Sequence, residues 1–236
     1  HWNQKQYILC TQCRQHLKLL AMDIMYLRKE CKKWYDCILY AVFIIFLDKT
    51  ANSRTAEAII AMLIVIHLLS IIMQRNWFHK MMVLFTSGAF LLCVGIPFIG
   101  SYLYIHKPEL FLQHDGTMLS RIQLTTTFYL RNGGFGFYGF PIEDQDCLDM
   151  MFSYIGLHWG TAAFIIISAA IIYAIYKASR EQHTSFLILL FFFLVYGWAE
   201  VAPIYPVYSY LSLLLGYYIM NRKPFYCKRP YTCANF

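Results

Sequence analysis

The sequence predicts an all-α integral membrane protein with about six transmembrane helices and one large extracytoplasmic loop. Hydrophobic residues make up 59% of the 236-residue chain and charged residues only 14%, whereas soluble domains are about 45–50% apolar and about 25% charged. The apolar residues fall in blocks of roughly 15–25 residues, the length at which a helix crosses the hydrocarbon core of a bilayer. Lys and Arg gather in alternate segments between these blocks, and this pattern sets the topology of membrane proteins.

The candidate spans follow one another along a transmembrane domain that covers residues 35–220. An N-terminal segment, 1–34, mixes Leu and Met with many basic residues, and we expect it to lie on the cytoplasmic surface as an amphipathic helix. A basic tail follows the domain at 221–236. The expected spans are residues 35–47, 56–74, 81–104, 151–176, 185–202 and 204–220.

The basic residues predict the orientation of these spans. All Lys and Arg residues lie in segments 1–34, 75–80, 177–184 and 221–236, except for Lys49, Arg54, Lys107, Arg121 and Arg131. By the positive-inside rule the basic segments and both termini are cytoplasmic, and the long loop at 105–150 is outside. The net charge of +7 is thus a topology signal, and no nucleic-acid partner is expected.

The cysteines give a weaker signal. Cys10 and Cys13 have CxxC spacing, but no second pair and no paired histidines complete a zinc site. A reducing cytoplasm also argues against a disulfide there. No metal or cofactor is expected. Because the chain begins at His1 without a signal pattern, we expect it to be a piece of a longer protein.

Arg54 stands at the outer start of the second span, in the stretch TANSRTA. Ser53 or Asn52 can cap a helix that begins near Thr55. A positive charge has the wrong sign for a helix N-terminus, but the free N–H groups there attract anions. The arginine fork donates two parallel hydrogen bonds to a phosphate. Arg54 is therefore a candidate anion ligand, and the alternative is an arginine that anchors the helix at the membrane interface.

The outer loop holds two further features. Residues 117–131, with Arg121 and Arg131, place apolar side chains at helical spacing and predict an amphipathic helix at the outer membrane surface. The stretch GGFGFYGFP then begins at Gly133. It lacks the Lys of a phosphate loop. We interpret it as a tight turn whose aromatic rings can stack on a sugar ring, or as a re-entrant hairpin. The expected apolar face of the helix consists of Leu119, Ile122, Phe128 and Leu130.

Two carboxylates lie at the outer ends of spans. Asp149 precedes the fourth span, and Glu200 ends the fifth. Carboxylates at membrane depth are costly and usually face a wet cavity or a charged partner. Both are therefore candidate functional residues.

Taken in order, these stretches resemble the oligosaccharide repeat-unit polymerases of bacterial capsule, exopolysaccharide and O-antigen synthesis. The resemblance covers about residues 40–220. The chain departs from the family at Ser120, where glycine often precedes the loop arginine, and at Met150 and Met151, where Asn and Tyr often follow the aspartate. It also has fewer spans than such polymerases. The resembling stretches are TANSRTA, LSRIQL, GFGFYGFPI, LDMMFSYIGLHWG and VYGWAEVAPIYPVYSYLSLLLG.

The resemblance implies a C-type membrane glycosyltransferase that needs neither a nucleotide sugar nor a metal. It would move a growing glycan from its undecaprenyl pyrophosphate carrier to another lipid-linked unit, on the outer face of the cytoplasmic membrane. A flippase and a chain-length regulator of the same pathway would be partners. Arg54 and Arg121 would stabilise the pyrophosphate, and Asp149, Glu200 or His114 would serve the acceptor hydroxyl. The expected substrate-binding residues are Ser53, Thr55, Ser120, Arg131, Tyr138 and His114.

Three other functions remain open. A ligase would transfer the finished glycan from the same carrier, and the sequence does not separate it from a polymerase. A transporter or flippase of lipid-linked oligosaccharide would show inverted repeats and broken helices at the midplane. A structural membrane subunit would leave Arg54, Arg121, Asp149 and Glu200, all on one side, unexplained.

Overall fold

The computed structural model describes residues 54–111, 117–142, 148, 150–199, 216 and 218–220. Side chains are described for all of these except residues 54–57, 59, 60, 110, 117 and 199. Within the described residues every secondary-structure element is helical, as the composition predicted. The helices are α3 (Arg54–Ile72), α4 (Arg75–His106), η1 (Pro108–Leu110), α5 (Thr117–Arg131), α6 (Met151–Tyr154), η2 (Ile155–Trp159), α7 (Thr161–Arg180) and α8 (Thr184–Ala199).

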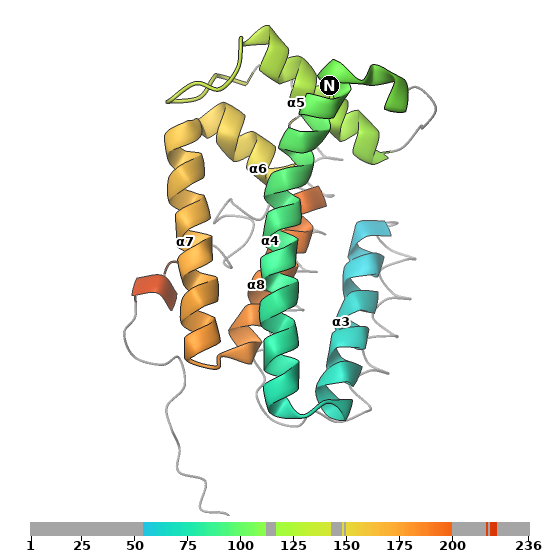
Figure 1. The fold of residues 1–236 in the computed structure, drawn as a ribbon, viewed down its shortest axis with the longest axis vertical. Helices are drawn as coiled ribbons and strands as arrows, with labels where there is room; N and C mark the ends of the chain where they lie inside the picture. Colours follow the sequence, from blue (N-terminus) through green and yellow to red (C-terminus); the bar gives the residue numbers. More distant parts are fainter. Residues whose placement is uncertain are drawn as a thin grey trace, which may run out of the picture.

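Four of these helices form a bundle in which the chain runs alternately up and down (Figure 1). Helices α3, α4, α7 and α8 pack side by side, and α4 touches each of the other three. Tight turns at residues 73–74 and 181–183 join them at the lower end in Figure 1. Helix α5, together with α6 and η2, lies across the upper end.

Helices α4 and α7 are long and apolar enough to cross a membrane, judged by length and composition. The apolar parts of α3 and α8 are shorter, at Ala61–Ile72 and Thr184–Trp198. Leu91 and Ile166 point outward on α4 and α7 and are about two-thirds exposed, at 67% and 68%. Spans predicted at 35–47 and 204–220 fall outside the described residues, apart from 216 and 218–220. The six predicted spans are therefore not shown as a set.

The structure corrects three predicted boundaries. Residues 75–80, predicted as a loop, form the first turns of α4, and α7 continues through Arg180. The predicted span at 151–176 is not one helix, because Gly160, with a φ of 93°, separates η2 from α7. Hydropathy marks the apolar part of a helix, so it misses the polar turns that extend it. Hydropathy also does not detect a glycine that interrupts a helix within an apolar run.

The core of the bundle lies between α4 and α8. Thr86 Oγ1 donates a hydrogen bond to the Leu187 carbonyl over 3.1 Å, and Cys93 Sγ donates to the Leu194 carbonyl over 2.9 Å. Small polar side chains of this kind tie helices together where water is excluded. They fix α4 and α8 side by side along two turns of each helix.

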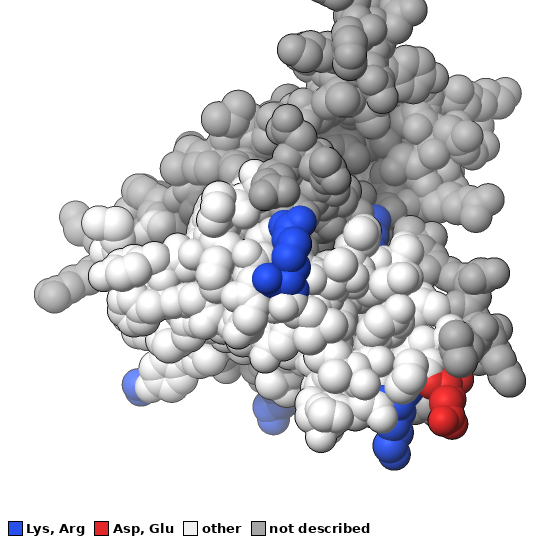
Figure 2. All heavy atoms as spheres, turned by 90° about the horizontal axis from the view of Figure 1, so that it is seen from above, with Lys and Arg blue, Asp and Glu red and all other residues white. Residues whose placement is uncertain are grey.

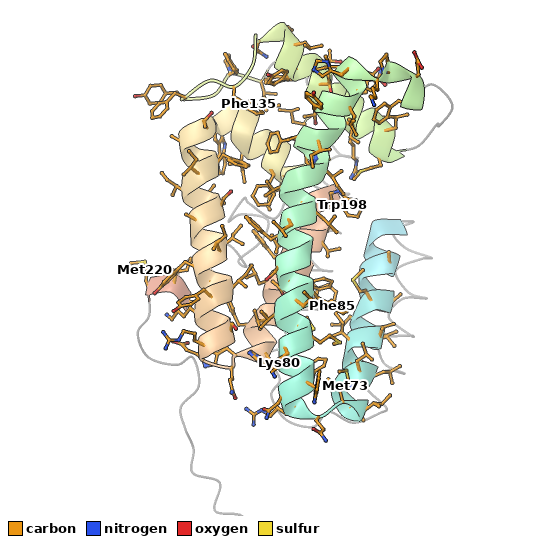
Figure 3. The ribbon with its side chains drawn as sticks, viewed as in Figure 1. Met73, Lys80, Phe85, Phe135, Trp198 and Met220 are labelled. Carbon is orange, nitrogen blue, oxygen red and sulfur yellow. The ribbon has the colours of Figure 1, made fainter. Side chains whose placement is uncertain are left out.

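Charged residues divide between the two ends. Arg75, Lys80, Lys177 and Arg180 lie at or next to the turns of the lower end, where Figure 3 labels Lys80. Seen from the α5 end, the described surface is mainly uncharged, with basic side chains set apart from one another and an acidic side chain beside one of them (Figure 2). The described basic residues that were predicted to share one side of the membrane therefore share one end of the bundle.

Candidate functional site

Helix α5 is held on the upper end of α4 by a close contact. A Cβ built on Gly100 of α4 would lie 2.9 Å from Ile122 Cδ1, so any larger residue here would make Ile122 or α5 shift. Thr125 Oγ1 donates a hydrogen bond to Ser153 Oγ of α6 over 3.3 Å, and both side chains are buried. Helix α5 is thereby fixed against α4 and α6 together.

The predicted amphipathic helix at 117–131 is confirmed, and α5 has the same limits. Ile122 and Phe128 are buried as predicted, but Leu130 is 58% exposed. Leu130 follows Phe128 by two residues, which is about 200° around a helix, so the two cannot share a face.

Arg121 and Arg131 occupy opposite ends of α5. Arg121 is half-buried, whereas Arg131 is exposed and holds its guanidinium 5.2 Å from the centre of the Phe128 ring. Ten residues of helix separate the two arginines by about 15 Å along the axis. They therefore lie more than two helical turns apart. Ser120, beside Arg121, is exposed.

The glycine-rich stretch forms a loop that docks on the helix break. Phe140 N–H donates to the Leu157 carbonyl over 2.9 Å, and Thr161 N–H donates to the Gly136 carbonyl over 3.0 Å. The Thr161 hydroxyl donates to the same Gly136 carbonyl over 3.2 Å. The first N–H groups of α7 are thus occupied by the loop, and they do not form an open anion site. We call residues 133–140 the docked loop.

His158 joins this arrangement from η2, a π-helical turn. Its Nδ1 lies 2.8 Å from the Phe140 carbonyl. A carbonyl only accepts, so Nδ1 carries the proton in the neutral ring and Nε2 is left as an acceptor. Sequence reasoning did not select His158, because the apolar run around it looked like a continuous span. Gly156 and Gly160 on either side were the signal that could have suggested a break.

Tyr138 lies at the exposed tip of the docked loop. It is 86% exposed, and its ring contacts Phe137 edge-on at a centroid distance of 4.9 Å. Phe140 instead packs against a small buried cluster of Phe128, Leu148 and Leu157. The Tyr138 side chain is thus outside the packed core and accessible to a ligand.

The remaining candidates are placed only in part. Ser53, His114, Asp149 and Glu200 lie outside the described residues, as do Cys10 and Cys13. Helix α3 begins at Arg54, followed by Thr55, but neither side chain is described. The starting end of α3 points toward the same end of the bundle as α5 (Figure 1). Among the described residues no group of His, Cys, Asp and Glu is arranged to hold a metal ion.

The structure thus joins the docked loop and His158 at the upper end of the bundle, and it places Arg121 and Ser120 at the same end, in the first half of α5. Comparison with protein-family models, curated proteins and solved structures finds no match for this chain.

Proposed function

We propose that this chain belongs to a membrane glycosyltransferase that polymerises lipid-linked oligosaccharide units on the outer face of the bacterial cytoplasmic membrane. One observation supports this above others. Helix α5, which contains LSRIQL, packs against LDMMFSYIGLHWG through the hydrogen bond from Thr125, the residue after LSRIQL, to Ser153. GFGFYGFPI packs against LDMMFSYIGLHWG through the Phe140–Leu157 hydrogen bond. This packing of stretches far apart in the sequence supports a shared role for them in one reaction.

The chemistry assigns a role to each part. The leaving group is a lipid pyrophosphate, so a cation at the membrane boundary would stabilise the charge that grows on it. Arg121 is the described residue suited to this role, and Arg54 is the second candidate. Asp149 would orient or deprotonate the acceptor hydroxyl. Its neighbours Leu148 and Met150 are buried, so the chain on both sides of Asp149 is held at this end.

The helix break does not favour transport. Transporters place broken helices and their binding site near the middle of the membrane. Here the break at Gly160 lies at the upper end of α7, beside α5 and the docked loop. This position suits chemistry at the membrane surface. A ligase that uses the same carrier remains the alternative, because it would need the same cations.

Glycan chain length tests the proposal. The full-length protein would be expressed in a host that lacks its own polymerase, beside Arg54→Ala, Arg121→Ala, Arg121→Lys and Asp149→Asn at matched membrane levels. We expect a ladder from the unmodified protein and single lipid-linked units from the variants. Arg121→Lys should recover only part of the ladder, because a lysine cannot make two parallel hydrogen bonds to a phosphate.

Arg75→Ala is the matched control, because it removes the same charge at the opposite end of the bundle. It should leave the ladder intact. A full ladder from Arg121→Ala would show that Arg121 only anchors α5. If the unmodified protein makes no ladder and single units stay on the inner leaflet, transport replaces polymerisation as the function.

A further inference from the structure

A cavity of about 340 Å³ lies under the docked loop, between α4 and α7. Figure 3 shows Phe135 above these two helices at the upper end. The Phe98 ring meets the Phe135 and Phe164 rings edge-on, at centroid distances of 5.3 and 5.4 Å. The cavity is lined by Val94, Phe98, Phe135, Gly156, Thr161 and Phe164.

The lining offers almost nothing to a polar ligand. Among the described lining residues only Thr161 has a side-chain hydroxyl, and that group already donates to the Gly136 carbonyl. An apolar cavity of about 150 Å³ holds one benzene molecule. By that measure this cavity has room for roughly a dozen carbon atoms. A hydrocarbon chain is therefore the class of ligand that fits it.

The position of the cavity connects it with α5. Helix α5 crosses α4 at Gly100, and the lining residues Phe98 and Val94 lie two and six residues earlier. Those intervals are about 3 and 9 Å along a helix axis. Ile99 and Ile165, next to two of the lining phenylalanines, are 61% and 60% exposed on the outer faces of α4 and α7. The cavity thus lies about one to two helical turns below the level at which α5 crosses, on the side of α4 that faces α7, and beside surface that membrane hydrocarbon would cover.

We propose that this cavity holds a section of the polyprenyl chain of a lipid pyrophosphate, with the charged end of the lipid at α5. The choice of a polyprenyl lipid rests on the proposed function. The cavity selects for hydrocarbon, and Arg121, at the same end of the bundle, would suit a lipid that carries an anionic head. Phe135 of the docked loop and Gly156 of η2 both line the cavity. A polyprenyl chain bound there would therefore lie beside the docked loop and His158.

Gly156 provides a sharp test. A Cβ at this position would lie 3.4 Å from Phe98 Cζ and 3.6 Å from both Phe135 and Phe164, which are ordinary contact distances. Gly156→Ala should therefore fold while taking up room for about one methylene group. Gly156→Leu would fill more of the cavity. Val94→Phe fills it from the opposite wall and keeps the test available if the leucine variant does not fold.

The experiment measures photocrosslinking of a diazirine-bearing polyprenyl pyrophosphate to the full-length protein in vesicles of phosphatidylethanolamine and phosphatidylglycerol. Labelling should map to the residues around Phe98 and Phe164. Gly156→Ala should weaken binding about four-fold, the effect of one lost methylene contact. Gly88→Ala, whose added methyl meets nothing within 4 Å, should bind as the unmodified protein does.

Three results would overturn the inference. They are equal labelling of Gly156→Ala and Gly88→Ala, labelling elsewhere on the chain, and equal labelling by phosphatidylglycerol with a diazirine on its acyl chain. The last would make the occupant an ordinary bilayer lipid. Labelling that maps as expected in a protein that makes no glycan ladder would support the lipid site and overturn only the proposed polymerase.

Discussion

The backbones of Gly139 and Gly160 lie in direct contact, with no room for a side chain on either residue. A Cβ on Gly139 would lie 2.6 Å from Gly160 N, and a Cβ on Gly160 would lie 2.6 Å from Tyr138 C. Both glycines also have positive φ angles, of 76° and 93°. The docked loop and the start of α7 are therefore a single packed unit, although about twenty residues separate these glycines.

Gly139→Ala should detach the docked loop. The positive φ alone costs an L-residue about 1–2 kcal/mol, and the new methyl would also strike the backbone of His158 and Gly160. Withdrawal of the loop would then break its hydrogen bonds, worth about 1 kcal/mol each. The measurement is the midpoint of thermal unfolding in detergent, together with protease cleavage within residues 133–140.

Gly133→Ala separates the cost of the positive φ angle from the cost of the steric clash. Gly133 has a φ of 70°, but a Cβ there would meet nothing within 4 Å. It should therefore show only the cost of the backbone angle and keep the loop protected from protease. Equal losses in the two variants would mean that the contact with Gly160 does not hold the loop.

Substitutions of His158 test whether its Nδ1 holds the loop. His158→Ala removes the hydrogen bond to the Phe140 carbonyl, and we expect a loss of stability of about 1 kcal/mol. His158→Asn should restore most of it, because the asparagine Nδ2 occupies nearly the same place as Nδ1 and also donates. His158→Gln should behave like alanine. Thermal unfolding of the three variants would decide, and a ranking with Gln above Asn would contradict this role.

The contact between Gly100 and Ile122 predicts an interaction between two substitutions. Gly100→Ala places a methyl 2.9 Å from Ile122 Cδ1, and overpacking of this kind costs about 1–3 kcal/mol. Ile122→Val alone should cost about 0.5–1.5 kcal/mol. Because valine lacks Cδ1, the double variant should lose less stability than the sum of the two. Strict additivity in thermal unfolding would show that α5 shifts away instead.

Gly88→Ala serves as the control for that cycle. It lies in the same helix, and its added methyl meets open space. Alanine favours a helix over glycine by about 1 kcal/mol. This variant should therefore be slightly more stable than the unmodified protein. At Gly100 the overpacking against Ile122 opposes the same gain, so Gly100→Ala should be the less stable of the two variants.

The sequence predicted features that depend on patterns over many residues, and it missed features that depend on a single tertiary contact. The limits of α5 followed from a periodic pattern over four turns, and the helical class followed from composition over the whole chain. The contact of Gly139 with Gly160 could not be predicted, because it depends on a tertiary approach of two backbones. The role of His158 was hidden for the same reason, since its partner is a main-chain carbonyl that no sequence pattern marks.

Tyr218 is the centre of a second network, at the lower end of the bundle. Its hydroxyl donates to Glu181 Oε2 over 3.1 Å, and the hydroxyl oxygen of Tyr218 also lies 3.1 Å from His183 Nδ1. Because the tyrosine proton is used on Glu181, His183 Nδ1 must be the donor in that second contact. The Tyr218 ring stacks on Phe186 at a centroid distance of 3.8 Å, and Lys177 Nζ donates to the Tyr218 carbonyl over 2.7 Å.

Substitutions of Tyr218 should divide this network into polar and stacking parts. Tyr218→Phe loses both hydroxyl contacts but keeps the ring on Phe186, so we expect a loss of about 1–2 kcal/mol. Tyr218→Leu also loses the aromatic pair, worth about a further 0.5–1.5 kcal/mol. Tyr173→Phe removes the same hydroxyl from a half-exposed side chain of α7 and should change little. If thermal unfolding places Tyr218→Phe level with Tyr173→Phe, the hydroxyl does not link Tyr218 to the α7–α8 turn, and stacking on Phe186 alone holds it there.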